Sequence, residues 1–355
     1  MATTTPPPVN LWVILSESKR IINAHSRHFL ALSVLFLLPL CFSITVYPSV
    51  FRLITDQSAA SHNTVSLLRR SLHNDDQQQP QPNTDSDTKT ILLLVIAYIV
   101  VITVFNLLAT GSIAYSVFQG FYGRPVKLIS AVKSSFTSFF PLLATLISSN
   151  FIVLGILLIL GISTLLSIKL IKIIQGFEFV YSSQAVSVLT TIVSIVVVIV
   201  IMIVIKLYVN WILAWVIVVV ESAWGLTPLK RSKSLVKGMK GVSFSIIFFF
   251  ATTESIMVWI STTLAASAEL YEDDENGGKL WTNVFFVVQI VITSAFLTLL
   301  TLYNLAATTV MYMYCKAVHG ELALEIAEEF AREYVSLPFD DGKVPHLVSV
   351  AYNNI

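Results

Sequence analysis

Six long apolar runs, separated by polar segments, dominate the pattern of the chain. They cover approximately residues 29–50, 91–119, 139–168, 185–220, 242–268 and 281–314. About 20 apolar residues suffice for a helix to cross the hydrocarbon core of a bilayer, and every run reaches that length. The pattern therefore predicts an all-α, polytopic integral membrane protein with six transmembrane helices.

The fourth run is longer than a single crossing requires. It holds 36 residues and contains no glycine or proline that would mark a turn. At about 1.5 Å per residue, a helix of this length spans about 54 Å, whereas the hydrocarbon core is roughly 30 Å thick. We therefore expect one continuous helix whose end projects beyond the bilayer.

Basic, amphipathic segments precede three of the runs, at residues 10–32, 123–145 and 225–247. In the third segment, Thr227 and Pro228 are typical of an N-cap and a first helical turn. Two groups of side chains follow on adjacent sides of this helix: the apolar Leu229, Leu235, Val236 and Met239, and the basic Lys230, Lys233, Lys237 and Lys240. Such a helix, with Arg231 as a fifth cation, is suited to binding anionic lipid headgroups. A basic loop that only fixes topology is the alternative.

The three segments together predict amphipathic helices around the cytosolic face of a six-helix bundle. An internal duplication and a coincidence of membrane-protein sequence patterns both remain open as their origin. The chain then divides into an amphipathic N-terminus (residues 1–28), a six-span domain (29–318) and a tail (319–355). The polar outer loop at 56–90 is expected to be disordered.

Positive charge predicts the orientation of these parts. Fourteen Lys and Arg residues lie on the side of the N-terminus. The other side has seven, at Arg52, Arg69, Arg70, Lys89, Lys169, Lys172 and Lys279. Cytoplasmic loops carry the excess of Lys and Arg, so we expect both termini in the cytosol. The membrane is expected to belong to the endomembrane system, as the endoplasmic reticulum or the plasma membrane.

Composition narrows the classes of function. The chain is 55% hydrophobic and 12% charged, whereas soluble domains are about a quarter charged. No basic segment combines with the aromatic residues and motifs of a nucleic-acid binder, so no nucleic-acid partner is expected. Cys41 and Cys315 provide neither a disulfide framework nor a zinc-binding spacing. The N-terminus does not resemble a cleaved signal peptide, so the first run is expected to remain as an anchor.

Lys206 and Glu254 are ionisable residues deep inside the fourth and fifth runs. An ionisable residue is costly inside a bilayer and is a functional hypothesis by default. Their similar depth suggests a Lys206–Glu254 pair, which serves either as a structural ion pair or as an ion relay. Five amides are expected to hydrogen-bond between helices: Asn106, Asn150, Asn210, Gln289 and Asn304. No catalytic constellation or metal-binding spacing is present, so we expect no enzymatic activity, metal or cofactor.

The tail is predicted to begin with a one-faced helix. Its apolar positions recur every four residues, at Leu322, Ile326, Phe330 and Tyr334. An apolar, extended end follows. This tail either packs on the cytosolic face of the bundle or docks a cytosolic protein partner.

The stretch "WILAWVIVVVESAWGLTPLKRSKSLVKG" resembles a known family. A long helix ends in Glu-x-x-x-Gly and is followed by an Arg-Ser pair and Leu-x-Lys-Gly; the matching positions are Glu221, Gly225, Arg231, Ser232, Leu235, Lys237 and Gly238. This pattern is similar to the six-span membrane domain fused to some bacterial glycerophosphodiester phosphodiesterases. The chemistry of that family belongs to a separate soluble barrel, so the resemblance implies no catalytic residue. The segments "CKAVHGE" and "EYVSLPFDDGKVPHLVSV" resemble plant six-span membrane proteins of unsettled function.

These observations favour a non-enzymatic membrane protein that interacts with lipids or acts as a scaffold at the cytosolic face. The alternative is a small-solute or ion transporter in which the Lys206–Glu254 pair and the intramembrane amides line the path.

Overall fold

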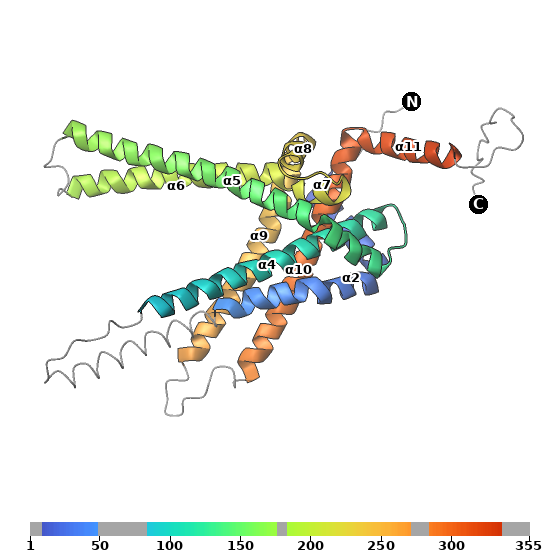
Figure 1. The fold of residues 1–355 in the computed structure, drawn as a ribbon, viewed down its shortest axis with the longest axis horizontal. Coiled ribbons are helices and arrows are strands. Elements are labelled where there is room, and N and C mark those ends of the chain that lie inside the picture. Colours follow the sequence, from blue (N-terminus) through green and yellow to red (C-terminus); the bar gives the residue numbers. More distant parts are fainter. Residues whose placement is uncertain (1–8, 49–83, 176–182, 271–283, 336–355) are drawn as a thin grey trace, which may run out of the picture. The chain divides into compact units, whose positions relative to one another are not determined.

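The computed structural model of the protein describes residues 9–48, 84–175, 183–270 and 284–335 (Figure 1). Within these ranges the regular structure is entirely helical. Six helical stretches are long and apolar enough to cross a membrane: Ser26–Pro48, Ile91–Phe121, Leu128–Leu166, Val193–Val220, Lys240–Thr263 and Val287–Val318. The prediction of an all-α membrane protein with six spans is therefore confirmed.

Within the described ranges, short segments separate successive helices. Their bounds are α1 (Leu11–Ala24), α2 (Ser26–Leu32), the π-helix η1 (Ser33–Leu37), α4 (Thr84–Phe121), α5 (Leu128–Gln175), α6 (Ser183–Trp211), α7 (Ala214–Val220), α8 (Thr227–Leu235), α9 (Lys240–Leu270), α10 (Val284–Val318) and α11 (Glu321–Val335). Residues 38–48 continue the first span as a helix. The chain forms two compact units, Met1–Tyr312 and Met313–Ile355.

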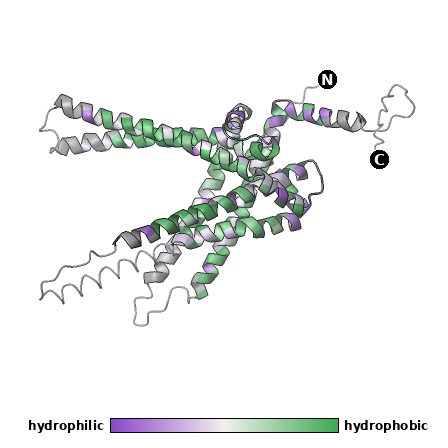
Figure 2. Ribbon diagram, viewed as in Figure 1, coloured by the Kyte–Doolittle hydropathy of each residue, from purple (hydrophilic) through white to green (hydrophobic). Residues whose placement is uncertain are grey.

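The long helices carry apolar side chains along most of their length (Figure 2). Many of these side chains are exposed, among them Phe151 and Ile159 on α5 and Ile201 and Met202 on α6. Large exposed apolar surfaces are unfavourable in water but match the hydrocarbon core of a bilayer. Backbone groups in that core must be paired within the protein, and a helix pairs them internally. The exposed apolar side chains therefore suit these helices to a position across a bilayer.

Serine and threonine fit into these spans because their hydroxyls find partners on their own helix. The hydroxyl of Thr45 donates to the Cys41 carbonyl at 2.9 Å, and that of Ser116 donates to the Ser112 carbonyl at 2.7 Å. Such bonds to the carbonyl four residues earlier satisfy the hydroxyl without a second helix. Small polar residues therefore interrupt the apolar runs without ending the helices.

The centre of the first unit lies where α4, α5 and α7 meet. Leu107 and Ala114 of α4, Leu142 of α5 and Val218 of α7 are almost fully buried in one cluster. Near this cluster α4 and α5 approach closely: a Cβ added to Gly111 would lie 2.9 Å from the Cα atom of Ser135. Small residues allow transmembrane helices to pack backbone against backbone in this way.

The amphipathic helices are only partly as predicted. α1 is a separate helix that buries Ile14, Ile21 and Ile22, and α8 is separate from α9. The segment before the third span is different, because it forms the first turns of α5 and continues into the span without a break. The prediction of a separate amphipathic helix at residues 123–145 was therefore wrong.

Two further boundaries differ from the expected ones. The fourth span is not continuous, because α6 ends at Trp211 and α7 begins at Ala214. α4 begins at Thr84, so residues 84–90 of the outer loop are helical. The rest of that loop as far as residue 83, and the tail after residue 335, lie outside the described residues.

Candidate functional site

A break in the fourth span, at Ile212 and Leu213, is held by a side chain from α8. The fully buried hydroxyl of Ser232 donates to the Asn210 carbonyl at 2.7 Å and accepts from the Leu213 N–H at 3.2 Å. A continuous helix would have paired both backbone groups internally. Ser232 therefore replaces the hydrogen bonds that the break removes, and it fixes α8 to the α6–α7 junction.

Glu221 ends α7 and joins it to two other elements. One carboxylate oxygen accepts a hydrogen bond of 2.8 Å from the hydroxyl of Tyr312 on α10. The other carboxylate oxygen lies 3.5 Å from Nε of Arg231 on α8. Tyr312 is fully buried, whereas Arg231 and Glu221 are partly exposed. The carboxylate thus joins α7, α8 and α10 at one end of the fourth span.

Two glycines of the sequence motif provide backbone conformations that other residues rarely adopt. Gly225, between α7 and α8, has φ +71°, and Gly238, between α8 and α9, has φ +105°. Nothing lies within 4 Å of an added Cβ at either position, so the constraint is the backbone angle and not space. Glycine adopts positive φ without the steric penalty of a Cβ. The motif of Glu221, Gly225, Arg231, Ser232 and Gly238 is therefore the set of residues that places α8.

The two sides of α8 have different surroundings. The apolar side chains Leu229, Leu235, Val236 and Met239 are between 0% and 6% exposed, because they pack on the protein. Lys230 and Lys233 on α8, Lys237 in the turn that follows, and Lys240 at the start of α9 are exposed, and we call these four the α8 cations. Arg231 differs from these four because it is paired with Glu221. The apolar and basic side chains are separated by burial as predicted, but the helix is shorter than predicted, because α8 ends at Leu235, before Val236, Lys237, Met239 and Lys240.

Two details of the predicted helix need correction. The N-cap of α8 is Leu226 and not Thr227, which is already helical, and no side chain caps the first turn. The apolar side of α8 contacts protein, so it is not available for insertion into lipid. The α8 cations are exposed, as are Ser234 on the same helix and Trp224 and Leu226 just before it.

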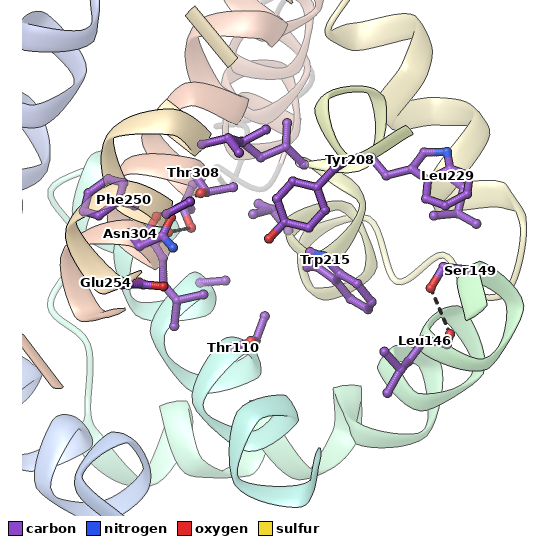
Figure 3. A pocket seen from close by; sticks show the side chains of 18 of the residues that line it. Thr110, Leu146, Ser149, Tyr208, Trp215, Leu229, Phe250, Glu254, Asn304 and Thr308 are labelled. Carbon is purple, nitrogen blue, oxygen red and sulfur yellow. Dashed lines mark hydrogen bonds between the residues drawn. The ribbon is translucent and has the colours of Figure 1, made fainter. Parts of the chain in front are cut away.

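A cavity of about 380 Å³ lies between the helices of the first unit, next to α8. Every helix from α4 to α10 contributes to its wall; α8 contributes Leu229. Figure 3 shows Glu254 and Asn304 on one side of this space, with Tyr208 and Trp215 facing it from the α6–α7 region. We call it the Glu254 cavity. Its wall is mainly apolar and carries a few polar groups, as is typical of small-molecule sites.

The structure places Glu254 beside Asn304 and not beside Lys206. The side chain of Asn304 on α10 lies beside the Glu254 carboxyl group in the wall of the cavity (Figure 3). Lys206 is exposed on α6 and is absent from the wall of the cavity. In the described part of the chain, neither residue takes part in an ion pair. The pair that we predicted from equal depth is therefore not formed.

The remaining predicted polar residues have separate positions. Asn150 joins Asn304 in the wall of the Glu254 cavity. Gln289 on α10 donates to the Ser261 carbonyl of α9 at 3.0 Å, as expected of an amide between helices. Asn210 is buried, whereas Asn106 is exposed. Among the residues that the structure describes, no group of three or more His, Cys, Asp or Glu could hold a metal ion.

Sequence reasoning missed three residues of these sites. Tyr312 was not recognised as the partner of Glu221, and neither Tyr208 nor Trp215 was assigned to a cavity. An aromatic residue in an apolar run looks like a core residue, so local pattern gives no signal for these roles. Only the spatial arrangement of distant helices brings them to the sites.

Comparison with known proteins gives a family but no relative of known activity. No curated protein shows significant similarity to the chain, and no solved structure does. A family profile described as a domain of unknown function, DUF8558, matches residues 9–342. This match covers nearly the whole chain, including both sites described above. The chain therefore belongs to the DUF8558 family.

Proposed function

We propose that the protein is a non-enzymatic, multi-pass membrane protein that binds anionic lipid headgroups through the α8 cations. The observation that carries the proposal is the burial pattern of α8 and the turn after it: the apolar side chains are buried in the protein, and the four α8 cations are exposed. α8 lies between the fourth and the fifth span in the chain, which supports a position of these lysines near the membrane surface. Each lysine near an anionic surface contributes about 1 kcal/mol to binding.

The proposal includes an orientation and a location. The excess of Lys and Arg on the side of the N-terminus favours the cytosol for both termini and for α8. Anionic lipids are enriched in the cytoplasmic leaflet, so the α8 cations would face the leaflet that attracts them. We place the protein in the endomembrane system, at the endoplasmic reticulum or the plasma membrane. Here the protein acts as a lipid-binding protein or scaffold, with α11 and the following tail as a docking element for a cytosolic partner.

The transporter alternative has less support. The predicted path was lined by Lys206, Glu254 and the intramembrane amides. Glu254, Asn150 and Asn304 do line the Glu254 cavity, but Lys206 is exposed and is absent from its wall. We therefore keep lipid binding as the proposed function.

Trp224 offers a direct test, because it is 69% exposed and lies three residues before α8. Energy transfer from Trp224 to dansyl-labelled phosphatidylserine, or to dansyl-labelled phosphatidylcholine, would be measured for the full-length protein in nanodiscs. A Trp224→Phe protein provides the background from the other tryptophans. The proposal predicts stronger transfer to phosphatidylserine, since the α8 cations would enrich that lipid near Trp224.

Two variants that differ only in charge separate binding from folding. Changing Lys230, Lys233 and Lys237 to Gln should remove most of the preference for phosphatidylserine, because about 3 kcal/mol of attraction is lost. Changing the same three residues to Arg should keep it. An equal preference in the Gln variant, the Arg variant and the unmodified protein would refute the proposal.

A further inference from the structure

We propose that the Glu254 cavity is a binding site for a small amphipathic amine. The proposal is independent of lipid binding by the α8 cations, because it rests on other residues, which surround a cavity between the helices of the first unit. The volume of about 380 Å³ falls in the range of small-molecule pockets. For comparison, an engineered cavity of roughly 150 Å³ in another protein holds benzene.

The charge of the ligand follows from the lining residues. Among the described residues that line the cavity, Glu254 is the only Asp, Glu, Lys, Arg or His. Asn304 adjoins its carboxyl group, and both side chains face the same space (Figure 3). A carboxyl group in a membrane span that faces a cavity, with no cation in the same wall, favours a ligand that brings the positive charge. An anionic ligand would meet repulsion from Glu254 without compensation.

Aromatic side chains supply the second part of the recognition. Tyr208, Trp211, Trp215 and Phe250 all contribute to the wall. The faces of such rings attract an organic cation, and their area binds the apolar body that carries it. Thr110 and Ser149 add hydroxyls on the walls formed by α4 and α5. An amine on a compact aromatic or aliphatic body satisfies the carboxyl group and the rings together.

A series of three probes with the same apolar body tests the charge directly. These are 4-phenylbutylamine, 4-phenylbutanol and 4-phenylbutyrate, titrated into the full-length protein in phosphatidylcholine nanodiscs, with empty nanodiscs as reference. Trp211 and Trp215 line the cavity, so binding should change the tryptophan fluorescence. We expect the amine to bind about tenfold or more tightly than the alcohol, since hydrogen bonds between charged groups are the strong ones. The carboxylate should bind most weakly.

Three variants assign the binding to this cavity. Glu254→Gln keeps the shape of the side chain and should reduce the preference for the amine over the alcohol to about onefold. Ala251→Leu adds volume in the wall of the cavity and should weaken amine and alcohol alike. Lys206→Gln is the matched control, because Lys206 lies outside the wall and its loss should leave all three affinities unchanged.

The results distinguish this proposal from a simple apolar void. Equal affinity for amine and alcohol in the unmodified protein would overturn it, as would an amine affinity that Ala251→Leu leaves unchanged. If Glu254→Gln does not fold, the comparison of the three probes and the Ala251→Leu variant still tests whether the cavity binds an amine. Nanodiscs that contain phosphatidylethanolamine, a lipid with an amine headgroup, separate two sources of the ligand. If this lipid competes and 4-phenylbutylamine binds more weakly, the ligand is a lipid amine; if binding is unchanged, the ligand is a soluble amine.

Discussion

Replacing Ser232 by alanine removes one hydroxyl that pairs two backbone groups at the α6–α7 break. The Asn210 carbonyl loses a donor at 2.7 Å, and the Leu213 N–H loses an acceptor at 3.2 Å. Ser232 and Leu213 are fully buried and Asn210 is nearly so; water therefore does not readily replace the hydroxyl. An unpaired buried polar group costs about 1–3 kcal/mol, so Ser232→Ala should lower the free energy of unfolding by about 2–4 kcal/mol.

Equilibrium unfolding in mixed micelles with an increasing fraction of dodecyl sulfate measures this change. Ser234→Ala is a matched control, because Ser234 lies on the same helix, is exposed, and donates to the nearby Arg231 carbonyl. The control should change the free energy of unfolding by less than about 0.5 kcal/mol. Equal effects of the two substitutions would refute the role of Ser232 at the break.

Three other substitutions test the packing and the backbone by the same measurement. Gly238→Ala should destabilise the protein by about 1–3 kcal/mol, because alanine rarely adopts the φ of +105° found there. Gly241→Ala is its control: this residue lies in the first turn of α9 with open space around it, so the change should be neutral or stabilising. Equal effects of these two would contradict the backbone argument. Gly111→Ala should cost about 1–3 kcal/mol because the new Cβ meets the backbone of α5, and Gly155→Ala, which has no atom within 4 Å of a new Cβ, should not. Tyr312→Phe should cost about 1.5–3 kcal/mol, since it removes a donor to the carboxylate at the end of α7, and a smaller loss than 0.5 kcal/mol would show that this bond does not hold the helices.

The six spans could be predicted because lipid imposes a simple rule: a long apolar run becomes a helix. The break in the fourth span could not. Residues 185–220 contain no glycine or proline, and the break is stabilised by Ser232, which lies 22 residues after Asn210. Local sequence does not report a partner at that distance.

The candidate sites show the same limit. Glu254 could be found because a carboxyl group in an apolar run is unusual. Lys206 was wrongly predicted as the partner of Glu254, because equal depth on two helices does not determine which way each side chain points. Lys206 points outward from α6, whereas Asn304 of α10 faces Glu254. The motif from Glu221 to Gly238 was noticed as a pattern, but its meaning, the placement of α8, follows only from the hydrogen bonds and φ angles.

The burial of the apolar side of α8 has a consequence for how the protein responds to membrane shape. Amphipathic helices that sense curvature do so by inserting apolar side chains between loosely packed lipids. Leu229, Leu235, Val236 and Met239 are occupied by the protein and have nothing to insert. If the α8 cations bind anionic lipid as proposed, we expect binding to depend on the charge of the membrane and not on its curvature.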